Sequence, residues 1–182
     1  MKRIIFAAIA ILLIGGAPQA SSNLAEIPHP QTNNLPPRQF KVLPEPIIQA
    51  LEAKGCLIPQ IDGRDQQANV INGLFRSEGR AAGQKDWAVL CSRNKRSSIL
   101  VFWNGSPKSV SEIAGLDETG CTRQIRIVGR EYILVHYENY KESGALKPPP
   151  IMHQGIEDSY CEKASVIKYW YRGKWLDLQG AN

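Results

Sequence analysis

The sequence predicts an α+β domain: a mainly antiparallel sheet of six or seven strands, with one short N-terminal helix packed on a face and disulfides stapling the fold. Three observations predict it. Most apolar residues lie in short runs that are rich in β-branched and aromatic residues, and these runs are separated by residues typical of turns. One segment carries the start and stop signals of a helix. The chain also opens like an exported protein and contains an even number of cysteines.

Residues 1–20 have the layout of a secretory signal peptide, in which two basic residues precede an uncharged run and small residues follow it. The apolar run is about half of the ~20 residues that a membrane-spanning helix needs, so a cleaved signal is favoured over an anchor. Cleavage after Ser22 fits the preference for small residues better than cleavage after Ala20. We therefore expect a periplasmic or extracellular protein with no transmembrane anchor after processing.

Residues 21–46 form a proline-rich segment that precedes the predicted domain. Proline removes an amide donor and fixes φ, so this stretch cannot form a helix or a central strand. We expect an extended, disordered leader with prolines at Pro28, Pro30, Pro36, Pro37, Pro44 and Pro46. Residues 47–182 then suffice for a single α+β domain.

A helix is predicted from Pro46 to the residue before Gly55, because proline is favoured in a first helical turn and glycine just beyond the last one. Ile47, Ile48 and Leu51 share one face of this helix and are expected to pack on a sheet. Cys56 follows directly and would fasten the end of the helix. A weaker helical turn is possible at 109–116.

The other elements are predicted as strands. Segments 86–91 and 98–103 are apolar on both alternating faces, which is typical of strands covered on both sides at the centre of a sheet. Segments 124–128 and 132–137 are expected to form a hairpin around Gly129-Arg130. A further candidate strand is 69–75.

The C-terminal segment predicts a hairpin with a defined register. Arg172-Gly173 is the expected turn, because glycine supplies the positive φ that a two-residue turn needs. The register that follows pairs Trp170 with Trp175, Tyr169 with Leu176, Lys168 with Asp177, and Tyr171 with Lys174. An aromatic pair and an opposite-charge pair in one register support it independently. We expect one face of this hairpin, preferably the tryptophan face, to be buried.

Four cysteines, Cys56, Cys91, Cys121 and Cys161, lie 35, 30 and 40 residues apart without a Cys-x-x-Cys pair. This spacing favours structural disulfides over a metal or redox site. Three connectivities are possible, and sequential pairing of Cys56 with Cys91 and Cys121 with Cys161 is preferred because it staples each half of the domain. Each such loop would contribute roughly 3–4 kcal/mol in the chain-entropy model.

The charge of the chain gives no indication of a nucleic-acid partner. The formal net charge is +5, and removal of residues 1–20 leaves 20 basic and 17 acidic residues, a net charge of +3. No clustered basic face accompanies this mild excess. The basic run 93–96 lies between two apolar segments and is interpreted as a solvated hairpin loop, with an anion-binding tip as the alternative.

No sequence motif for a nucleophile elbow, a zinc helix, a phosphate loop or a dinucleotide site occurs, so we expect no catalytic residue, metal or cofactor. His29 lies in the leader and His153 in a proline-rich loop. His136 is placed on the predicted strand, on the face of Tyr132 and Leu134, and is a candidate general base. The adjacent acids Glu157-Asp158 are expected in a solvated loop, with acid–base chemistry as the alternative.

Three segments resemble a single FG-GAP or VCBS-type repeat: Gly73-Leu74-Phe75, residues 84–90 and residues 98–103. Asp86 stands at the last aspartate of that family's calcium loop. The resemblance covers about 30 residues and implies an extracytoplasmic β-module that binds a partner. The family's calcium site does not carry over, because the loop 76–83 has one acid and two arginines where the ion needs several oxygen ligands.

The sequence favours an exported, non-enzymatic binding or accessory module whose partner is a protein, a glycan or an envelope component. Aromatic residues concentrated at hairpins motivate this hypothesis, since exposed rings are common binding platforms. The candidate ligand-facing residues are Trp103, Trp170, Tyr171 and Trp175, and the competing interpretation is that such rings fill the core. The alternatives are a small secreted hydrolase that uses His136 with a nearby carboxylate, and a structural envelope protein.

Overall fold

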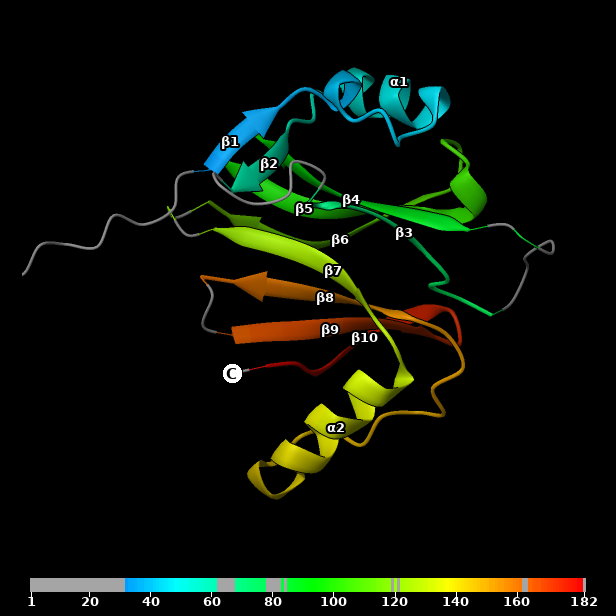
Figure 1. Cartoon of the computed structure of the whole chain (residues 1–182), viewed down its shortest axis with the longest axis vertical. Helices are drawn as coiled ribbons and strands as arrows, with labels where there is room; N and C mark the ends of the chain where they lie inside the picture. The colour runs from blue at the N-terminus through cyan, green and yellow to red at the C-terminus, as the bar shows by residue number, and fades with distance from the viewer. Residues whose placement is uncertain are drawn as a thin grey trace, which may run out of the picture.

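The computed structural model describes residues 32–61, 68–77, 83, 85–118, 120, 122–161 and 164–181. These residues form ten strands in three antiparallel sheets, together with two α-helices. Two four-stranded sheets pack face to face, and each carries one helix on its outer face. Figure 1 shows the resulting layers along the long axis: α1, the sheet β3–β6, the sheet β7–β10, and α2.

The expected antiparallel pairing and the helix on a sheet face are confirmed, but a single sheet of six or seven strands is wrong. The missed strands are polar or contain proline, as in Ile-Pro-Gln-Ile, so their periodicity is weak. The elements are β1 Thr32–Leu35, α1 Glu45–Ala53, β2 Ile58–Ile61, β3 Val70–Gly73, β4 Asp86–Arg93, β5 Arg96–Phe102, β6 Val110–Asp117, β7 Arg123–Val128, α2 Arg130–Tyr140, β8 Gly155–Tyr160, β9 Ala164–Tyr171 and β10 Lys174–Gln179. The strand orders are β1-β2, β3-β4-β5-β6 and β10-β9-β8-β7.

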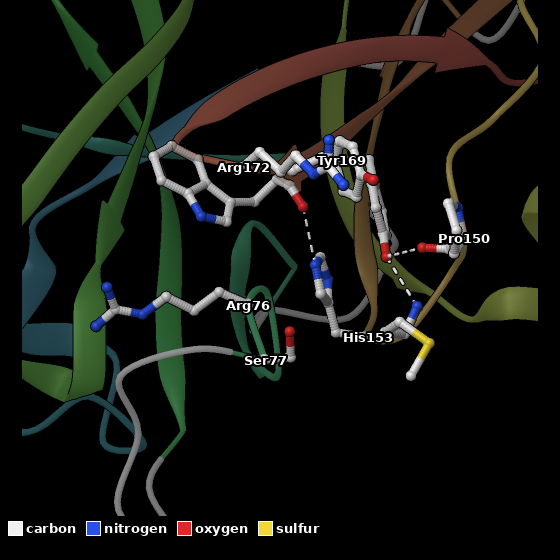
Figure 2. Close-up of a pocket in the computed structure, with 9 residues that line it drawn as sticks. Arg76, Ser77, Pro150, His153, Tyr169 and Arg172 are labelled. Carbon is white, nitrogen blue, oxygen red and sulfur yellow. Dashed lines mark hydrogen bonds between the residues drawn. The ribbon is translucent and has the colours of Figure 1, made fainter.

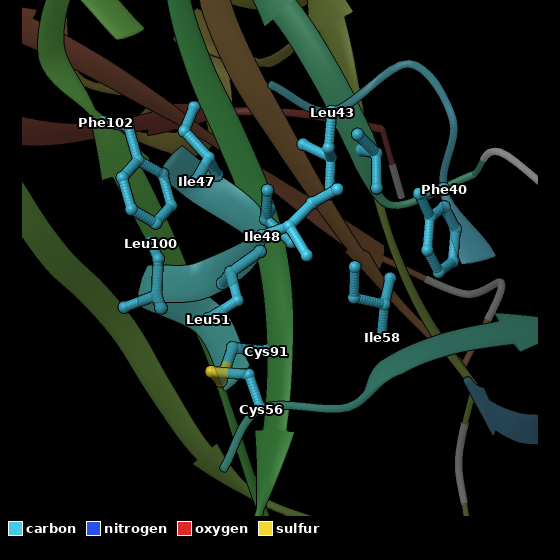
Figure 3. Packing of buried hydrophobic residues seen from close by; sticks show 12 residues of the cluster. Phe40, Leu43, Ile47, Ile48, Leu51, Cys56, Ile58, Cys91, Leu100 and Phe102 are labelled. Atoms are coloured by element: carbon cyan, nitrogen blue, oxygen red, sulfur yellow. A yellow bond between two sulfur atoms is a disulfide. The ribbon is translucent and has the colours of Figure 1, made fainter. Parts of the chain in front are cut away.

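Helix α1 covers the outer face of the sheet β3–β6, as its sequence predicts (Figure 3). Ile47, Ile48 and Leu51 are buried against alternate residues of the central strands β4 and β5. The other face of the same two strands meets the second sheet through Ala88, Leu90, Ile99 and Val101. Both central strands are therefore covered on both sides, which explains why neither shows an apolar–polar alternation.

The described part of the expected leader, residues 32–46, belongs to the folded domain. Strand β1 pairs with β2, and a 3-10 turn at Pro37–Gln39 leads towards α1. Phe40 and Leu43 are buried in the cluster beneath α1. The prolines exclude a central strand but permit this short edge strand, so the domain begins before residue 47. The predicted signal peptide, residues 1–20, and residues 21–31 lie outside the described residues.

The segment 132–137 is not a strand but part of α2, and the predicted hairpin at Gly129-Arg130 is therefore wrong. Ile133 is buried against Tyr169 and Ile167 on the outer face of the second sheet. Packing of this residue overrides the strand preference of a segment rich in aromatic and β-branched residues. The possible helical turn at 109–116 is also wrong, because this segment forms β6.

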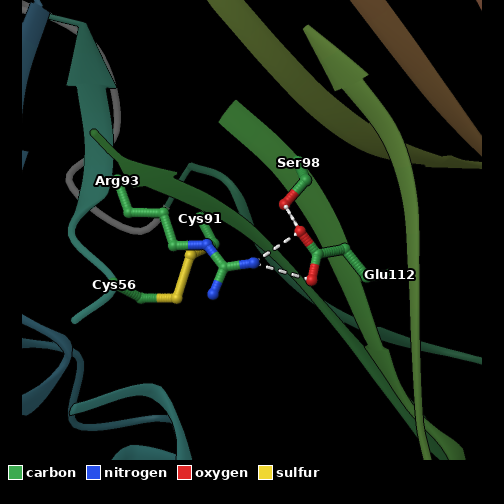
Figure 4. Close-up of a disulfide and its surroundings, with 5 residues drawn as sticks. All are labelled: Cys56, Cys91, Arg93, Ser98 and Glu112. Carbon is green, nitrogen blue, oxygen red and sulfur yellow. Dashed lines mark hydrogen bonds and ion pairs between the residues drawn. A yellow bond between two sulfur atoms is a disulfide. The ribbon is translucent and has the colours of Figure 1, made fainter. Parts of the chain in front are cut away.

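A disulfide joins Cys56, at the end of α1, to Cys91 of β4, with a Cα–Cα distance of 5.2 Å. This confirms the first predicted pair (Figure 4). Cys161 is also disulfide-bonded. Its predicted partner, Cys121, lies outside the described residues. The run 93–96 forms the β4–β5 hairpin turn as predicted, and its two arginines form ion pairs with Glu112 and Asp117.

The C-terminal hairpin has the predicted register, with Trp170 opposite Trp175 and Lys168 opposite Asp177. Arg172 and Gly173 both have positive φ in the turn, as this hairpin type requires. The tryptophans face the first sheet, whereas Tyr169 on the opposite face packs on α2. Both faces of the hairpin are therefore covered, rather than one.

Candidate functional site

A pocket of about 250 Å³ lies beside the turn of the C-terminal hairpin, where two distant segments meet it. We call it the hairpin pocket. One segment is Arg76-Ser77, which follows β3, and the other is the loop that precedes β8. The pocket is lined by Arg76, Ser77, Pro150, Met152, His153, Tyr169, Trp170, Tyr171 and Arg172. Figure 2 shows Arg172 on one side, with Arg76, Ser77 and His153 on the other.

A small ladder holds the two segments together. The backbone N–H of Gln154 donates to the carbonyl of Leu74 at 2.8 Å, and the N–H of Leu74 donates to Gln154 Oε1 at 2.8 Å. A Cβ at Gly73 would stand 2.9 Å from Gln154 Oε1 and 3.0 Å from the ring of Phe75. Glycine at this position therefore lets the amide side chain reach Leu74.

The loop that precedes β8 is fixed by Tyr169, which is fully buried. Its hydroxyl accepts a hydrogen bond from the N–H of Met152 at 2.9 Å and donates to the carbonyl of Pro150 at 3.4 Å. The ring of His153 stacks on the ring of Tyr169, with centroids 4.3 Å apart and planes 8° apart. The wall of the pocket is therefore built before any ligand arrives.

Both ring nitrogens of His153 are occupied by backbone carbonyls. Nε2 lies 2.8 Å from the oxygen of Trp170, and Nδ1 lies 2.9 Å from the oxygen of Gln154. A general base needs a nitrogen lone pair directed at the substrate. Neither nitrogen has that freedom, so His153 acts here as a fixed wall that joins the loop to the hairpin.

Arg76 and Arg172 supply the charge of the hairpin pocket, and no carboxylate is among its described lining residues. The guanidinium carbon of Arg76 lies 4.6 Å from the ring centroid of Trp103, and that of Arg172 lies 5.2 Å from the centroid of Tyr171. Such stacking fixes the plane of a guanidinium group while leaving its N–H edges available. The hairpin pocket is therefore electropositive and has aromatic walls.

The four predicted ligand-facing aromatics divide into two pairs. Trp170 and Tyr171 line the hairpin pocket. Trp103 and Trp175 stack between the sheets with centroids 5.6 Å apart, and Trp103 is only 5% exposed. The ring centroids of Trp103 and Trp170 are 5.0 Å apart, so Trp103 also packs against a residue that lines the pocket. We call Trp103, Trp170 and Trp175 the tryptophan cluster, which supports the pocket from behind.

The structure places His136 on helix α2 and not on the expected strand 132–137. Its ring lies between those of Tyr132 and Tyr140, at centroid distances of 4.2 and 6.4 Å. Among the described residues, no carboxylate forms a hydrogen bond or an ion pair with it, and its buried Nδ1 has no partner. Within the described ranges, the structure therefore brings no acid to this histidine for a hydrolytic site.

Glu157 and Asp158 lie buried on β8, not in a solvated loop, and each is paired with an arginine. Asp158 forms a bidentate pair with Arg123 at 2.7 Å, which we call the inter-sheet ion pair. The same guanidinium donates to the oxygens of Ser97 and Ala114 in the other sheet.

The carboxylate of Glu157 joins four elements of the second half of the domain. It accepts hydrogen bonds from Arg126 on β7, from Ser165 on β9, and from Tyr132 on α2. Burial alone would raise the pKa of Glu157, but these three donors outweigh burial and lower the pKa. With every oxygen engaged, this carboxylate is structural rather than available to a substrate.

A second, mostly apolar pocket of about 230 Å³ lies where β6 meets β8 and β9, lined in part by Leu116, Tyr160 and Val166. Its charged residues, Asp158 and Lys168, are both in ion pairs within the domain. Its charged groups are therefore already neutralised, in contrast to the two arginines of the hairpin pocket.

Asp86, the residue at the end of the calcium-loop resemblance, is fully buried. Its carboxylate accepts hydrogen bonds from the N–H of Phe75 and the N–H of Asn104, at 3.1 and 2.8 Å. These bonds fix the start of the segment that carries Arg76. Within the described residues, no group of three or more histidine, cysteine or acidic side chains could hold a metal ion.

Sequence reasoning did not identify Arg76, Arg172 and His153 as members of one site. They are separated by many residues, and only long-range packing brings them together. The available signal was the turn position of Arg172 beside two aromatic residues.

Over the described ranges, no helix is long and apolar enough to cross a membrane. Comparisons with known protein families, curated proteins and solved structures give no match.

Proposed function

We propose that the chain is a non-enzymatic binding module of the periplasm or the cell exterior, and that the hairpin pocket is its ligand site. The single observation that carries the proposal is the composition of this pocket. Arginine, hydroxyl and aromatic side chains are among its described lining residues, while His153 in its wall has both ring nitrogens occupied. Groups that recognise a ligand are present, and neither ring nitrogen of His153 is free to transfer a proton to a ligand.

Rigidity of the pocket wall supports binding as its role. Tyr169 and Gln154 fix the loop that precedes β8, and the tryptophan cluster supports the hairpin from behind. A preformed site loses little conformational entropy when it binds, which favours affinity for a small ligand or for one unit of a polymer. The disulfide between Cys56 and Cys91 is compatible with an oxidising compartment.

Backbone amide NMR tests the proposal. We would add a fragment set of neutral, cationic, anionic and aromatic small molecules to ¹⁵N-labelled protein comprising residues 21–182. We expect the shifted amides to cluster at residues 76–77, 152–154 and 170–172. Analysis of the same tubes for cleaved fragments tests for enzymatic activity.

Two outcomes would contradict the proposal. Shifts that cluster at the apolar pocket of Leu116 and Val166, with none at the hairpin pocket, would place ligand binding elsewhere. Turnover of a fragment that is lost when His136 is replaced by glutamine would favour the hydrolase hypothesis instead.

A further inference from the structure

Strand β6 lies at one edge of its sheet, and in the described part of the chain it pairs only with β5. The N–H of Trp103 donates to the carbonyl of Ser109, and hydrogen-bonded and non-hydrogen-bonded pairs alternate along an antiparallel ladder. Val110 and Glu112 therefore belong to non-hydrogen-bonded pairs with β5. Their backbone N–H and C=O groups point away from β5, and such a row of groups is a template for a further strand.

A β-bulge at Ala114-Gly115 redirects the second half of β6. Ala114 has a φ of 53°, which is strained for a residue with a Cβ, and strain of this kind is concentrated at functional sites. Arg123 donates to the carbonyl of Ala114 at 2.6 Å, and Arg96 donates to that of Gly115 at 3.2 Å, so two arginines hold the bulge. The extra residue shifts the alternation of side chains, and Leu116 therefore lines the pocket between β6 and the second sheet.

This pocket, which we call the apolar pocket, suits an uncharged side chain. Leu116 is 42% exposed and Val166 is 38% exposed, so its walls are open to water. Its two charged lining residues, Asp158 and Lys168, form ion pairs within the domain. Its volume of about 230 Å³ exceeds the roughly 150 Å³ of a cavity that holds a benzene ring, so a phenylalanine side chain fits.

The acids of the β6 edge indicate the charge of its partner. Glu112 and Asp117 lie on β6, and Glu118 follows it directly. Arg93 and Arg96 form ion pairs with the first two. Glu118 is exposed and forms no ion pair with the other described residues. The edge therefore keeps a negative charge, which favours a partner strand that carries a basic residue.

We propose that β6 and the apolar pocket bind an extended segment of a partner protein, which adds to the sheet as a further strand. Its main chain pairs with Val110 and Glu112, and one phenylalanine-sized side chain enters the pocket beside Leu116. In strand addition the main chain provides affinity and side-chain pockets provide specificity. Allowing for the bulge, the pocket lies roughly 10 Å along β6 from Glu112, or about three residues of the bound segment. No lining residue is shared with the hairpin pocket, so the two sites act independently.

Fluorescence anisotropy with labelled synthetic peptides tests the proposal. The probe is an eight-residue peptide in which threonine and valine alternate, with a lysine at each end and one central phenylalanine. A matched peptide with alanine in place of phenylalanine should bind at least about tenfold more weakly, because the buried ring is lost. Two further peptides carry N-methyl groups on alternate amides of one strand edge or of the other. Only the peptide whose methyl groups face β6 should lose binding.

Three variants of the protein locate the site. Leu116→Asp should weaken binding of the phenylalanine peptide at least about tenfold, because it places a charge in the apolar pocket. Val135→Asp is the matched control, since Val135 is 50% exposed on α2 and the same change there should leave binding unchanged. Val110→Pro removes an N–H that the ladder with β5 does not use, so it should weaken main-chain pairing while the sheet remains intact.

Several results would overturn the proposal. Equal binding of the phenylalanine and alanine peptides, or equal losses in Leu116→Asp and Val135→Asp, would exclude the apolar pocket. Loss of binding in both N-methylated peptides or in neither would exclude strand pairing, and no binding of any peptide at millimolar concentration would exclude the site. Sedimentation of the protein alone tests the remaining occupant: a dimer that Leu116→Asp dissociates would assign the edge to a second copy of the chain.

Discussion

Removal of Asp158 should destabilise the domain more than removal of any exposed acid. Its side chain is 7% exposed and that of Arg123 is 4% exposed, so the inter-sheet ion pair is almost fully shielded from water. Five hydrogen bonds are made by the guanidinium group of Arg123, two of them to Asp158. Asp158→Ala would leave a buried positive charge with two unpaired donors.

Breaking a buried ion pair by removing one partner costs about 3–5 kcal/mol in the free energy of unfolding. At roughly 2–4 °C per kcal/mol for a chain of this size, the melting temperature should fall by about 6–20 °C. Guanidinium denaturation of the wild type and of Asp158→Ala measures the loss. The double variant Arg123→Met/Asp158→Leu removes both charges and should recover part of it.

The matched control for this experiment is Asp177→Ala. Asp177 is 65% exposed and pairs with Lys168 on the neighbouring strand, so the same substitution there should cost no more than about 1 kcal/mol. Equal losses in Asp158→Ala and Asp177→Ala would refute the argument that burial makes the inter-sheet ion pair costly to break. A double variant less stable than Asp158→Ala would refute the role given to the unpaired charge.

Three further predictions concern acid stability, core packing and thiols. Burial opposes ionisation of Glu157, but hydrogen bonds from Arg126, Ser165 and Tyr132 lower its pKa, so the stabilisation it gives is present above the ordinary glutamate pKa of about 4.3 and is lost as the pH falls through the folded pKa. Glu157→Gln should therefore flatten the loss of stability measured between about pH 5 and pH 3. An unchanged slope would contradict this. Trp175→Ala should cost about 3 kcal/mol in denaturant melts, because the ring stacks on Trp103 between the sheets, and a cost near zero would contradict the packing. Thiol titration of denatured, unreduced mature protein should find no reactive sulfhydryl, and two or more would overturn the disulfide assignment.

The C-terminal hairpin and α1 could be predicted from the sequence because their signals are local. Arg172-Gly173 specifies the turn, and the Lys168–Asp177 pair fixes the register independently of the rest of the fold. Pro46 and Gly55 mark the two ends of helix α1, and the spacing of apolar residues within its nine residues already indicates the buried face.

Helix α2 could not be predicted from β-branched content, because packing of Ile133 on the second sheet decides its conformation. The four-residue spacing of Tyr132, His136 and Tyr140, whose rings contact one another along the helix, was the helical signal in this segment.

The hairpin pocket could be predicted only in part. The hairpin aromatics Trp170 and Tyr171 were correctly placed beside a turn, and both line the pocket. Arg76 and His153 join them through contacts between segments that are distant in sequence, such as the Leu74–Gln154 ladder. Local sequence periodicity does not predict contacts of this kind, because these contacts depend on how the two sheets pack against each other.

The central claim, that the hairpin pocket is the ligand site of this chain, is tested most directly by a variant that fills the pocket. Ser77 is exposed and lines the pocket, so Ser77→Trp places a bulky ring there. Fragments that shift the amides of residues 152–154 and 170–172 in the wild type should no longer shift them in Ser77→Trp, while the amide spectrum of the rest of the domain stays the same. Equal shifts in the wild type and in Ser77→Trp would contradict the claim.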